Sequence, residues 1–170
     1  FTSWKQESYE KRAEILHKVA SLMREKKEHL AKIITLEMGK LIAQAEGEIM
    51  LSADIFDYYA TNAAIFLADK HLEPEHGSAY VRCSPMGVIL GVEPWNFPFY
   101  QVARFAAPNL MIGNTVLVKH ASSVPQCAIA IEDLFIEASA PTGLYTNLFI
   151  SGERASALVS DKRIKGVALT

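Results

Sequence analysis

The chain has 170 residues, with 17 Lys and Arg against 19 Asp and Glu, and a formal charge of −2. Half of the residues are hydrophobic and 21% are charged, which is a globular composition and excludes disordered, collagen-like or low-complexity chains. A near-neutral charge without a basic block argues against nucleic acid as a partner, and no apolar run reaches the ~18 residues of a membrane span.

The pattern of the first 72 residues predicts helices. Ile15, Val19 and Leu22 recur at helical spacing, and a second helix is expected from Glu28 to a stop at Gly39. A long third helix follows, and its predicted buried face carries Ile49, Ala53, Phe56, Ala60, Ala63 and Leu67. We therefore expect an N-terminal helical region over residues 1–72.

Turn residues at 73–78 mark a change of pattern, and residues 79–83 alternate like a strand with two different faces. A small β arm, an oligomerisation segment, is expected over 73–86. From residue 87 onward, strands and helices alternate. Strands are expected at 87–92, 114–118, 144–150 and 164–169, with helices at 98–111, 124–139 and 153–159.

The buried strands between helices predict the fold class. Apolar β-branched runs spaced by helices are typical of a parallel sheet covered on both faces. We expect an α/β fold in which N-terminal helices precede a doubly wound parallel sheet, the sheet occupying residues 87–170.

The two ends of the chain suggest a larger protein. The chain begins at Phe1 and stops on a strand that would leave its sheet unfinished. We expect it to be part of a longer protein, and the alternative is a complete small domain with a terminal strand. Two cysteines and no signal peptide predict a cytoplasmic location.

The loop after the first strand of the sheet is a candidate site. Pro98 suits the first turn of the next helix, which places Asn96 beside a helix N-terminus. Its side-chain amide and the positive helix end could together hold a developing oxyanion. The alternative is that Asn96 merely caps the helix. The context Pro94-Trp95-Asn96-Phe97-Pro98 favours a site.

The loop after the second strand is a further candidate. Lys119 could reach a ribose hydroxyl or a phosphate of a nucleotide, although a lysine in such a place is usually only solvated. The turn at Ser151 and Gly152 could admit a nucleotide closely, or it could serve only as a turn. Neither a GxGxxG fingerprint nor a P-loop is present.

The metal-ligating residue types are dispersed. The five histidines are scattered, and Cys83 lies far from Cys127 in the sequence. We expect no metal site. Cys127 lies near a predicted helix start, which could lower its pKa, but its apolar neighbours favour a structural role for both cysteines.

Six segments cover nearly the whole chain: Leu-Glu-Met-Gly-Lys at 36–40, Pro-Met-Gly-Val-Ile-Leu-Gly at 85–91, Pro-Trp-Asn-Phe-Pro at 94–98, Gly-Asn-Thr-Val-Leu-Val-Lys at 113–119, Gly-Leu-Tyr-Thr-Asn at 143–147 and Val-Ala-Leu-Thr at 167–170. In their order and spacing, these segments resemble the aldehyde dehydrogenase superfamily, most nearly its bacterial succinate-semialdehyde dehydrogenase group.

The resemblance implies oxidation of an aldehyde to an acid with NADP or NAD. A cysteine thiolate attacks the carbonyl, hydride passes to the nicotinamide, and a glutamate-activated water hydrolyses the thioester. Asn96 matches the family's oxyanion-holding side chain, and Lys119 matches its adenine-ribose ligand. Trp95 and the segment His120, Ala121 and Ser122 line the cofactor cleft.

The chain departs from the family pattern in two ways. The family's cysteine, its glutamate base and a Gly-Ser beneath the pyrophosphate fall beyond residue 170, so this stretch alone should be inactive with an incomplete cofactor site. The usual Lys-Pro-Ser-Glu is Lys119-His120-Ala121-Ser122 here. The family's Glu repels a 2′-phosphate, and Ser122 removes that charge, so NADP should be tolerated or preferred.

A stripe on the helix after Asn96 suggests the substrate. Phe97, Gln101 and Arg104 fall at i, i+4 and i+7, and Arg104 lies about 9 Å along the axis from Pro98. A guanidinium there pairs well with a carboxylate, which the resemblance also implies. We expect a small carboxylated aldehyde such as succinic semialdehyde. The alternative is an Arg in a surface or interface ion pair.

Two other functions remain open from the sequence. The chain could be a non-catalytic nucleotide-binding module, or a piece for assembly whose arm at 73–84 pairs with a neighbouring subunit. For the catalytic reading, the expected partners are a small aldehyde and further copies of the same chain, as a dimer or tetramer.

Overall fold

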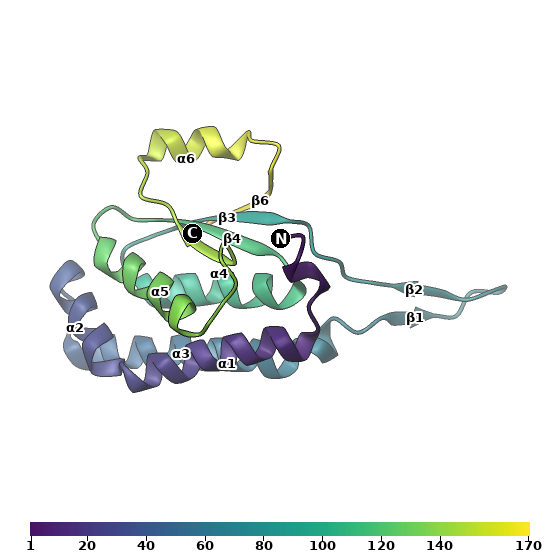
Figure 1. The fold of residues 1–170 in the computed structure, drawn as a ribbon, viewed down its shortest axis with the longest axis horizontal. Helices are drawn as coiled ribbons and strands as arrows, with labels where there is room; N and C mark the ends of the chain where they lie inside the picture. Colours follow the sequence, from purple (N-terminus) through teal and green to yellow (C-terminus); the bar gives the residue numbers. More distant parts are fainter.

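The computed structural model describes residues 1–170 and stacks its helices and strands in layers (Figure 1). The N-terminal helices form the outermost layer, α4 and α5 lie between them and the sheet, and α6 covers the opposite face. The helices are α1 (Tyr9–Glu25), α2 (Lys27–Met38), α3 (Ile42–Phe66), α4 (Pro98–Ile112), α5 (Pro125–Glu137) and α6 (Gly152–Val159). The strands are β1 (Lys70–Leu72), β2 (Ala79–Val81), β3 (Val88–Glu93), β4 (Thr115–His120), β5 (Tyr145–Asn147) and β6 (Ile164–Leu169).

The main sheet is parallel, with strand order β5-β4-β3-β6. The chain moves outward from β3 to β5 and then returns through α6 to β6, beside β3. This reversal places a topological switch point between β3 and β6, where open α/β sheets bind ligands at the carboxyl ends of the strands. The register pairs Glu93 with His120 at that edge, so the loops after β3 and β4 start side by side.

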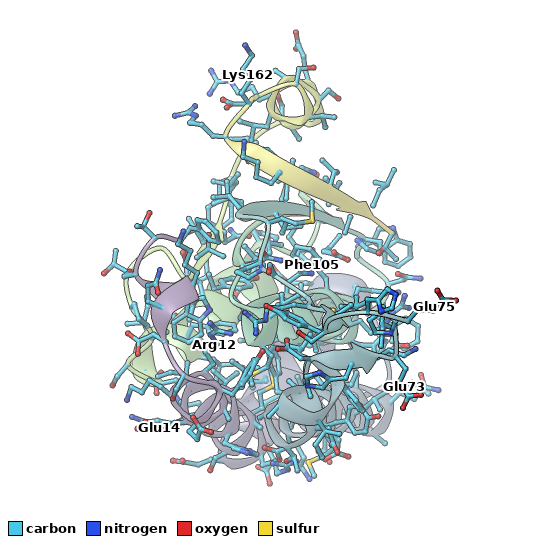
Figure 2. All side chains as sticks on the ribbon, turned by 90° about the vertical axis from the view of Figure 1, so that its right-hand side faces the viewer. Arg12, Glu14, Glu73, Glu75, Phe105 and Lys162 are labelled. Atoms are coloured by element: carbon cyan, nitrogen blue, oxygen red, sulfur yellow. The ribbon has the colours of Figure 1, made fainter.

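Close packing joins α4 to the central strand. A Cβ built on Gly91 of β3 would lie 2.6 Å from the ring of Phe105, so only glycine lets α4 approach this closely. Figure 2 shows Phe105 directly beneath the sheet. This contact packs the middle of α4 directly against β3.

The N-terminal helices share one core with the α/β part. The guanidinium of buried Arg12 donates to the carbonyls of Met111 (2.9 Å) and Lys5 (3.0 Å), and the Trp4 indole N–H donates to the carbonyl of Leu110 (3.0 Å). The hydrophobic core runs continuously from α1 to β5. The first region therefore serves as a support for α4 and α5.

Most predicted elements agree with the structure to within one or two residues, but two differ more. The predicted helical run to residue 72 is wrong at its end, since α3 stops at Phe66 and 70–72 form β1. Strand β1 pairs antiparallel with β2 in an extended arm, and both strands are exposed and three residues long, too short for a periodic signal (Figure 1). The helix predicted over 124–139 is among the elements that agree, since it spans 125–137. The strand predicted over 144–150 is only β5, because Leu148 to Ile150 leave the sheet to line a cavity.

Candidate functional site

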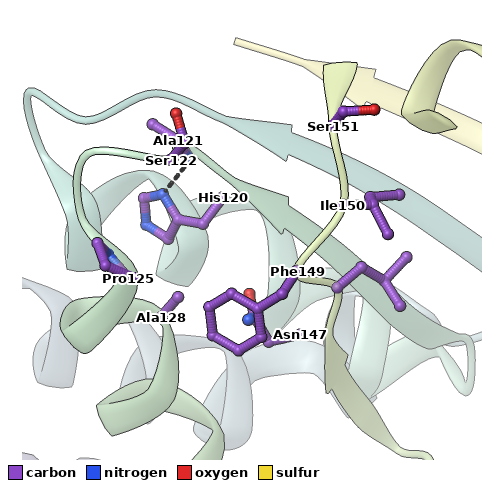
Figure 3. A pocket seen from close by; sticks show the side chains of 10 residues that line it. His120, Ala121, Ser122, Pro125, Ala128, Asn147, Phe149, Ile150 and Ser151 are labelled. Carbon is purple, nitrogen blue, oxygen red and sulfur yellow. Dashed lines mark hydrogen bonds between the residues drawn. The ribbon is translucent and has the colours of Figure 1, made fainter. Parts of the chain in front are cut away.

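His120 links the two loops at the carboxyl edge of the sheet. His120 is 5% exposed, and its Nδ1 accepts the Ala121 N–H (2.9 Å, Figure 3). Its Nε2 donates to the carbonyl of Pro98 (2.9 Å). These two bonds require the neutral ring with its proton on Nε2, and burial lowers the pKa of His120 accordingly. The side chain thereby ties the loop after β4 to the first turn of α4.

The loop after β3 presents Trp95 and Asn96 to solvent. Phe97 is the N-cap residue of α4 but gives no side-chain cap, and Pro98 occupies the first helical position as predicted. The cap comes instead from Glu48 of α3, whose Oε1 accepts the N–H groups of Phe99 (2.9 Å) and Tyr100 (3.2 Å).

This cap bears on the capping interpretation of Asn96. The capping alternative is wrong, because Glu48 performs that role and the Asn96 side chain stays at the surface. The predicted stabilisation of an oxyanion by the N-terminus of α4 is also reduced, because the first N–H groups of this helix donate to Glu48. The Asn96 side-chain amide is left as the donor that this loop can offer to an oxyanion.

A cavity of about 310 Å³ opens where β4 and β5 end (Figure 3). Its walls combine the loop after β4, the start of α5 and the segment after β5. The lining residues are His120, Ala121, Ser122, Pro125, Ala128, Asn147, Leu148, Phe149, Ile150 and Ser151. The structure thus brings the predicted cofactor residues 120–122 together with the predicted turn at Ser151.

The other predicted cofactor residues lie outside this lining. Lys119 precedes His120 on β4, so its side chain projects from the opposite face of the sheet, toward the α6 side. Trp95 and Asn96 belong to the neighbouring loop. The predicted cofactor residues therefore divide into three groups: residues 120–122 in the cavity wall, half-buried Lys119 on the other face of the sheet, and exposed Trp95 and Asn96 in the neighbouring loop.

Asn147 is a cavity residue that the sequence analysis treated only as part of a motif. It is 8% exposed, and neither side-chain amide atom has a hydrogen-bond partner. Leaving a buried amide unsatisfied costs about 1–3 kcal/mol, so the Asn147 amide would gain from a partner such as water or a bound ligand. Its position as the last residue of a short buried strand could have identified it as a candidate site residue.

A second cavity, of about 500 Å³, lies between α4 and the end of β6. It contains Gln101 and Arg104, as the stripe predicted, together with Thr170. Phe97 is not among its lining residues, because its non-helical backbone (φ −141°, ψ 73°) directs the ring away from the stripe. The Arg104 guanidinium is exposed, and its carbon lies 5.4 Å from the centroid of the Tyr100 ring.

Glu93, which the sequence analysis did not single out, is a buried carboxyl group at the same edge. It is the last residue of β3 and 3% exposed, and neither carboxylate oxygen has a hydrogen-bond partner. Burial raises the pKa of Glu93 to about 7, against the opposing effects of Thr170 and Arg104. The sequence feature that could have identified Glu93 is an isolated acidic residue at the end of a predicted apolar strand.

The raised pKa of Glu93 predicts a pH-dependent loss of stability. The folded chain holds this proton up to about pH 7, whereas the unfolded chain releases it near 4.5, so stability falls as pH rises between those values. Glu93→Gln should remove this part of the dependence and stabilise the chain above pH 7 by on the order of 3 kcal/mol. Urea unfolding followed by circular dichroism near pH 5 and pH 8 measures it. Parallel pH profiles for both proteins would contradict the prediction.

The cysteines do not form a reactive site. The thiol of Cys127 is buried at the start of α5, and burial raises its pKa far above the ordinary value. The N–H groups of Gln126 (2.7 Å) and Cys127 (2.8 Å) donate to the carboxylate of Glu37, which caps α5. Cys83 is exposed. No three His, Cys, Asp or Glu side chains gather as a metal site, and none of the helices combines the length and apolarity of a membrane span.

Helices on both faces of a parallel sheet, with a cavity at its carboxyl edge, define an open α/β protein, a class whose ligands bind at that edge. The model of the aldehyde dehydrogenase family matches residues 1–170, and the chain belongs to that family.

Individual relatives agree with this assignment. A succinate-semialdehyde dehydrogenase [NADP(+)] of Deinococcus radiodurans is 46% identical over 170 residues, and a probable enzyme of the same name from Synechocystis is 44% identical. The structure of succinic semialdehyde dehydrogenase from Streptococcus pyogenes in complex with NADP+ is 47% identical, with a TM-score of 0.95 over 99% of this chain. An NAD-dependent aldehyde dehydrogenase from Sinorhizobium meliloti is 32% identical, with a TM-score of 0.92 over 98% of this chain.

The chain is much shorter than these relatives. It spans 36% of the Deinococcus protein and 37% of the Synechocystis protein. It also covers 37% of the Streptococcus structure and 34% of the Sinorhizobium structure.

Proposed function

We propose that this chain forms the N-terminal part of an NADP-dependent dehydrogenase that oxidises succinic semialdehyde to succinate. The observation that carries the proposal is the cavity at the end of β4, which contains Ser122 and is tied through His120 to the loop of Asn96. The names of the Deinococcus and Synechocystis relatives support the substrate and the cofactor.

The cavity is compatible with one end of a dinucleotide. Its volume of about 310 Å³ is at the lower end of the range for small-ligand pockets. The hydroxyls of Ser122 and Ser151 and the unpartnered amide of Asn147 offer hydrogen bonds, and no carboxylate is in the lining. A ribose 2′-phosphate would therefore meet no like charge from the wall, which supports NADP over NAD.

Asn96 would supply the electrophilic assistance. Its amide N–H donates to the aldehyde oxygen as that oxygen becomes negative, and the exposed loop leaves room for a substrate from the β6 side. NADP, when bound, accepts the hydride. Arg104, on the next turns of α4, would hold the far carboxylate of the substrate. By the family resemblance, the cysteine nucleophile and the glutamate base lie outside these residues.

A direct assay of the whole enzyme tests this proposal. Formation of NADPH from succinic semialdehyde is expected at a kcat/KM at least ~10-fold above that for butanal, since a guanidinium pairs with the substrate carboxylate only in the first case. Binding of NADP without turnover of any aldehyde would instead favour a non-catalytic module.

We also propose that the whole enzyme is a cytoplasmic homo-oligomer. The β1–β2 arm extends from the body and leaves Leu72, Tyr80 and Val81 exposed, as expected for strands that pair with a neighbouring subunit. Size-exclusion chromatography at several concentrations tests the assembly, and a strictly monomeric enzyme would contradict it.

Replacing Arg104 tests the proposed substrate. Arg104→Ala is expected to raise KM for succinic semialdehyde by about 10- to 100-fold, because a charge-assisted pair is lost, and to change KM for butanal little. Steady-state kinetics with both aldehydes measure the difference. Equal effects on the two substrates would mean that Arg104 does not recognise the carboxylate.

A further inference from the structure

A buried ion pair lies beneath the loop of Asn96. Lys40 follows α2 directly after Gly39, which ends that helix in the left-handed conformation (φ 77°). The Lys40 ammonium pairs with the carboxylate of Glu48 on α3, and the two side chains are 8% and 1% exposed. Buried charges are costly unless each is compensated, so each member of the pair depends on the other.

Both members of this pair also hold the loop itself. Lys40 Nζ donates to the backbone carbonyl of Asn96 (2.9 Å) and lies 3.7 Å from the centroid of the Phe97 ring. Glu48 Oε1 accepts the N–H groups of Phe99 and Tyr100. The pair thus binds the backbone carbonyl of Asn96 and the backbone N–H groups just after Pro98.

We propose that Lys40 and Glu48 are positioning residues for Asn96. Among the side-chain hydrogen bonds that reach this loop, the one to Asn96 is made at its backbone carbonyl, so the direction of the Asn96 amide depends on how that backbone is held. The ammonium fixes the carbonyl of residue 96, and the carboxylate fixes the helix that follows. The proposal rests on the proposed function, in which Asn96 assists the chemical step.

The test is a double-mutant cycle in the whole enzyme, with NADPH formation as the readout. Lys40→Met is expected to lower kcat by about 10- to 100-fold, since a displacement of about 1 Å at a catalytic group has this scale of effect, with KM for NADP changed less than ~2-fold. In an enzyme already carrying Asn96→Ala, Lys40→Met should lower kcat by less than ~2-fold, because coupled residues are not additive. Lys40→Arg should recover part of the lost kcat.

A matched control separates positioning from general stability. Lys27 pairs with Glu46 at 3.1 Å and joins the helices α2 and α3 without touching the loop. Lys27→Met should leave kcat unchanged. If Lys40→Met does not fold, Glu48→Gln replaces it in the same double-mutant cycle. This variant keeps an acceptor for the helix N–H groups but loses the charge opposite Lys40.

The outcomes distinguish this inference from the proposed function. Full kcat in Asn96→Ala would overturn the role of Asn96 in the proposed function, and the positioning role with it. A slow Asn96→Ala enzyme in which the Lys40→Met loss is fully retained would overturn only the positioning role, because the pair would then act independently of Asn96. An unchanged kcat in Lys40→Met would do the same.

Discussion

Asn96→Ala is expected to lower kcat for succinic semialdehyde by about 100- to 1,000-fold in the whole enzyme, the scale of losing one oxyanion donor. The reason is local: Glu48 occupies the first N–H groups of α4, so the helix end cannot replace the missing amide. KM for NADP should change little, since Asn96 lies outside the cavity of Ser122. Steady-state NADPH formation measures both constants.

A surface asparagine provides the control for this experiment. Asn62 is half-buried on α3, far from the loop of Asn96 in the sequence, and donates to the carbonyl of Tyr58 in the preceding turn. Asn62→Ala should keep the full kcat. If Asn96→Ala also kept it, the loop after β3 would be structural and the assignment of its role would be wrong.

Ser122→Glu is expected to reverse the cofactor preference. The new carboxylate would stand in the cavity wall against the 2′-phosphate of NADP, and like charges at close range cost several kcal/mol. We expect kcat/KM to fall by about 100-fold for NADP and to rise for NAD, whose free ribose hydroxyls can donate to the carboxylate.

The neighbouring serine provides a matched variant. Ser123 is exposed and is not part of the cavity lining. Ser123→Glu adds the same charge one residue away and should change the ratio of the two kcat/KM values far less. Equal shifts in both variants would point to a general electrostatic effect, and no shift in either would remove Ser122 from the cofactor site.

The helices and the sheet could be predicted from local patterns. Helix α2 ends where Gly39 allows the left-handed conformation, and the buried strands are continuous apolar runs. The β1–β2 arm could not be bounded in this way. Its strands are short and exposed, and they are defined by their pairing with each other across the turn rather than by a pattern within each strand.

The site was predicted where it depends on a local motif and missed where it depends on distant contacts. Asn96 was identified from its position after a strand, and Ser122 from the family resemblance of residues 119–122. Glu37 and Glu48, however, cap helices 89 and 51 residues further along, and an acid on a helix normally indicates a solvated face. Glu93 was missed because its burial depends on the packing of α4 and the end of β6 around β3.

The most direct test is a crystal structure of the whole enzyme with NADP and a bound aldehyde or aldehyde adduct. We expect the Asn96 Nδ2 to lie about 3 Å from the substrate oxygen, within hydrogen-bonding distance. We also expect the 2′-phosphate beside Ser122. An Asn96 amide turned away from the substrate, with that oxygen held by other groups, would contradict the proposed role of Asn96.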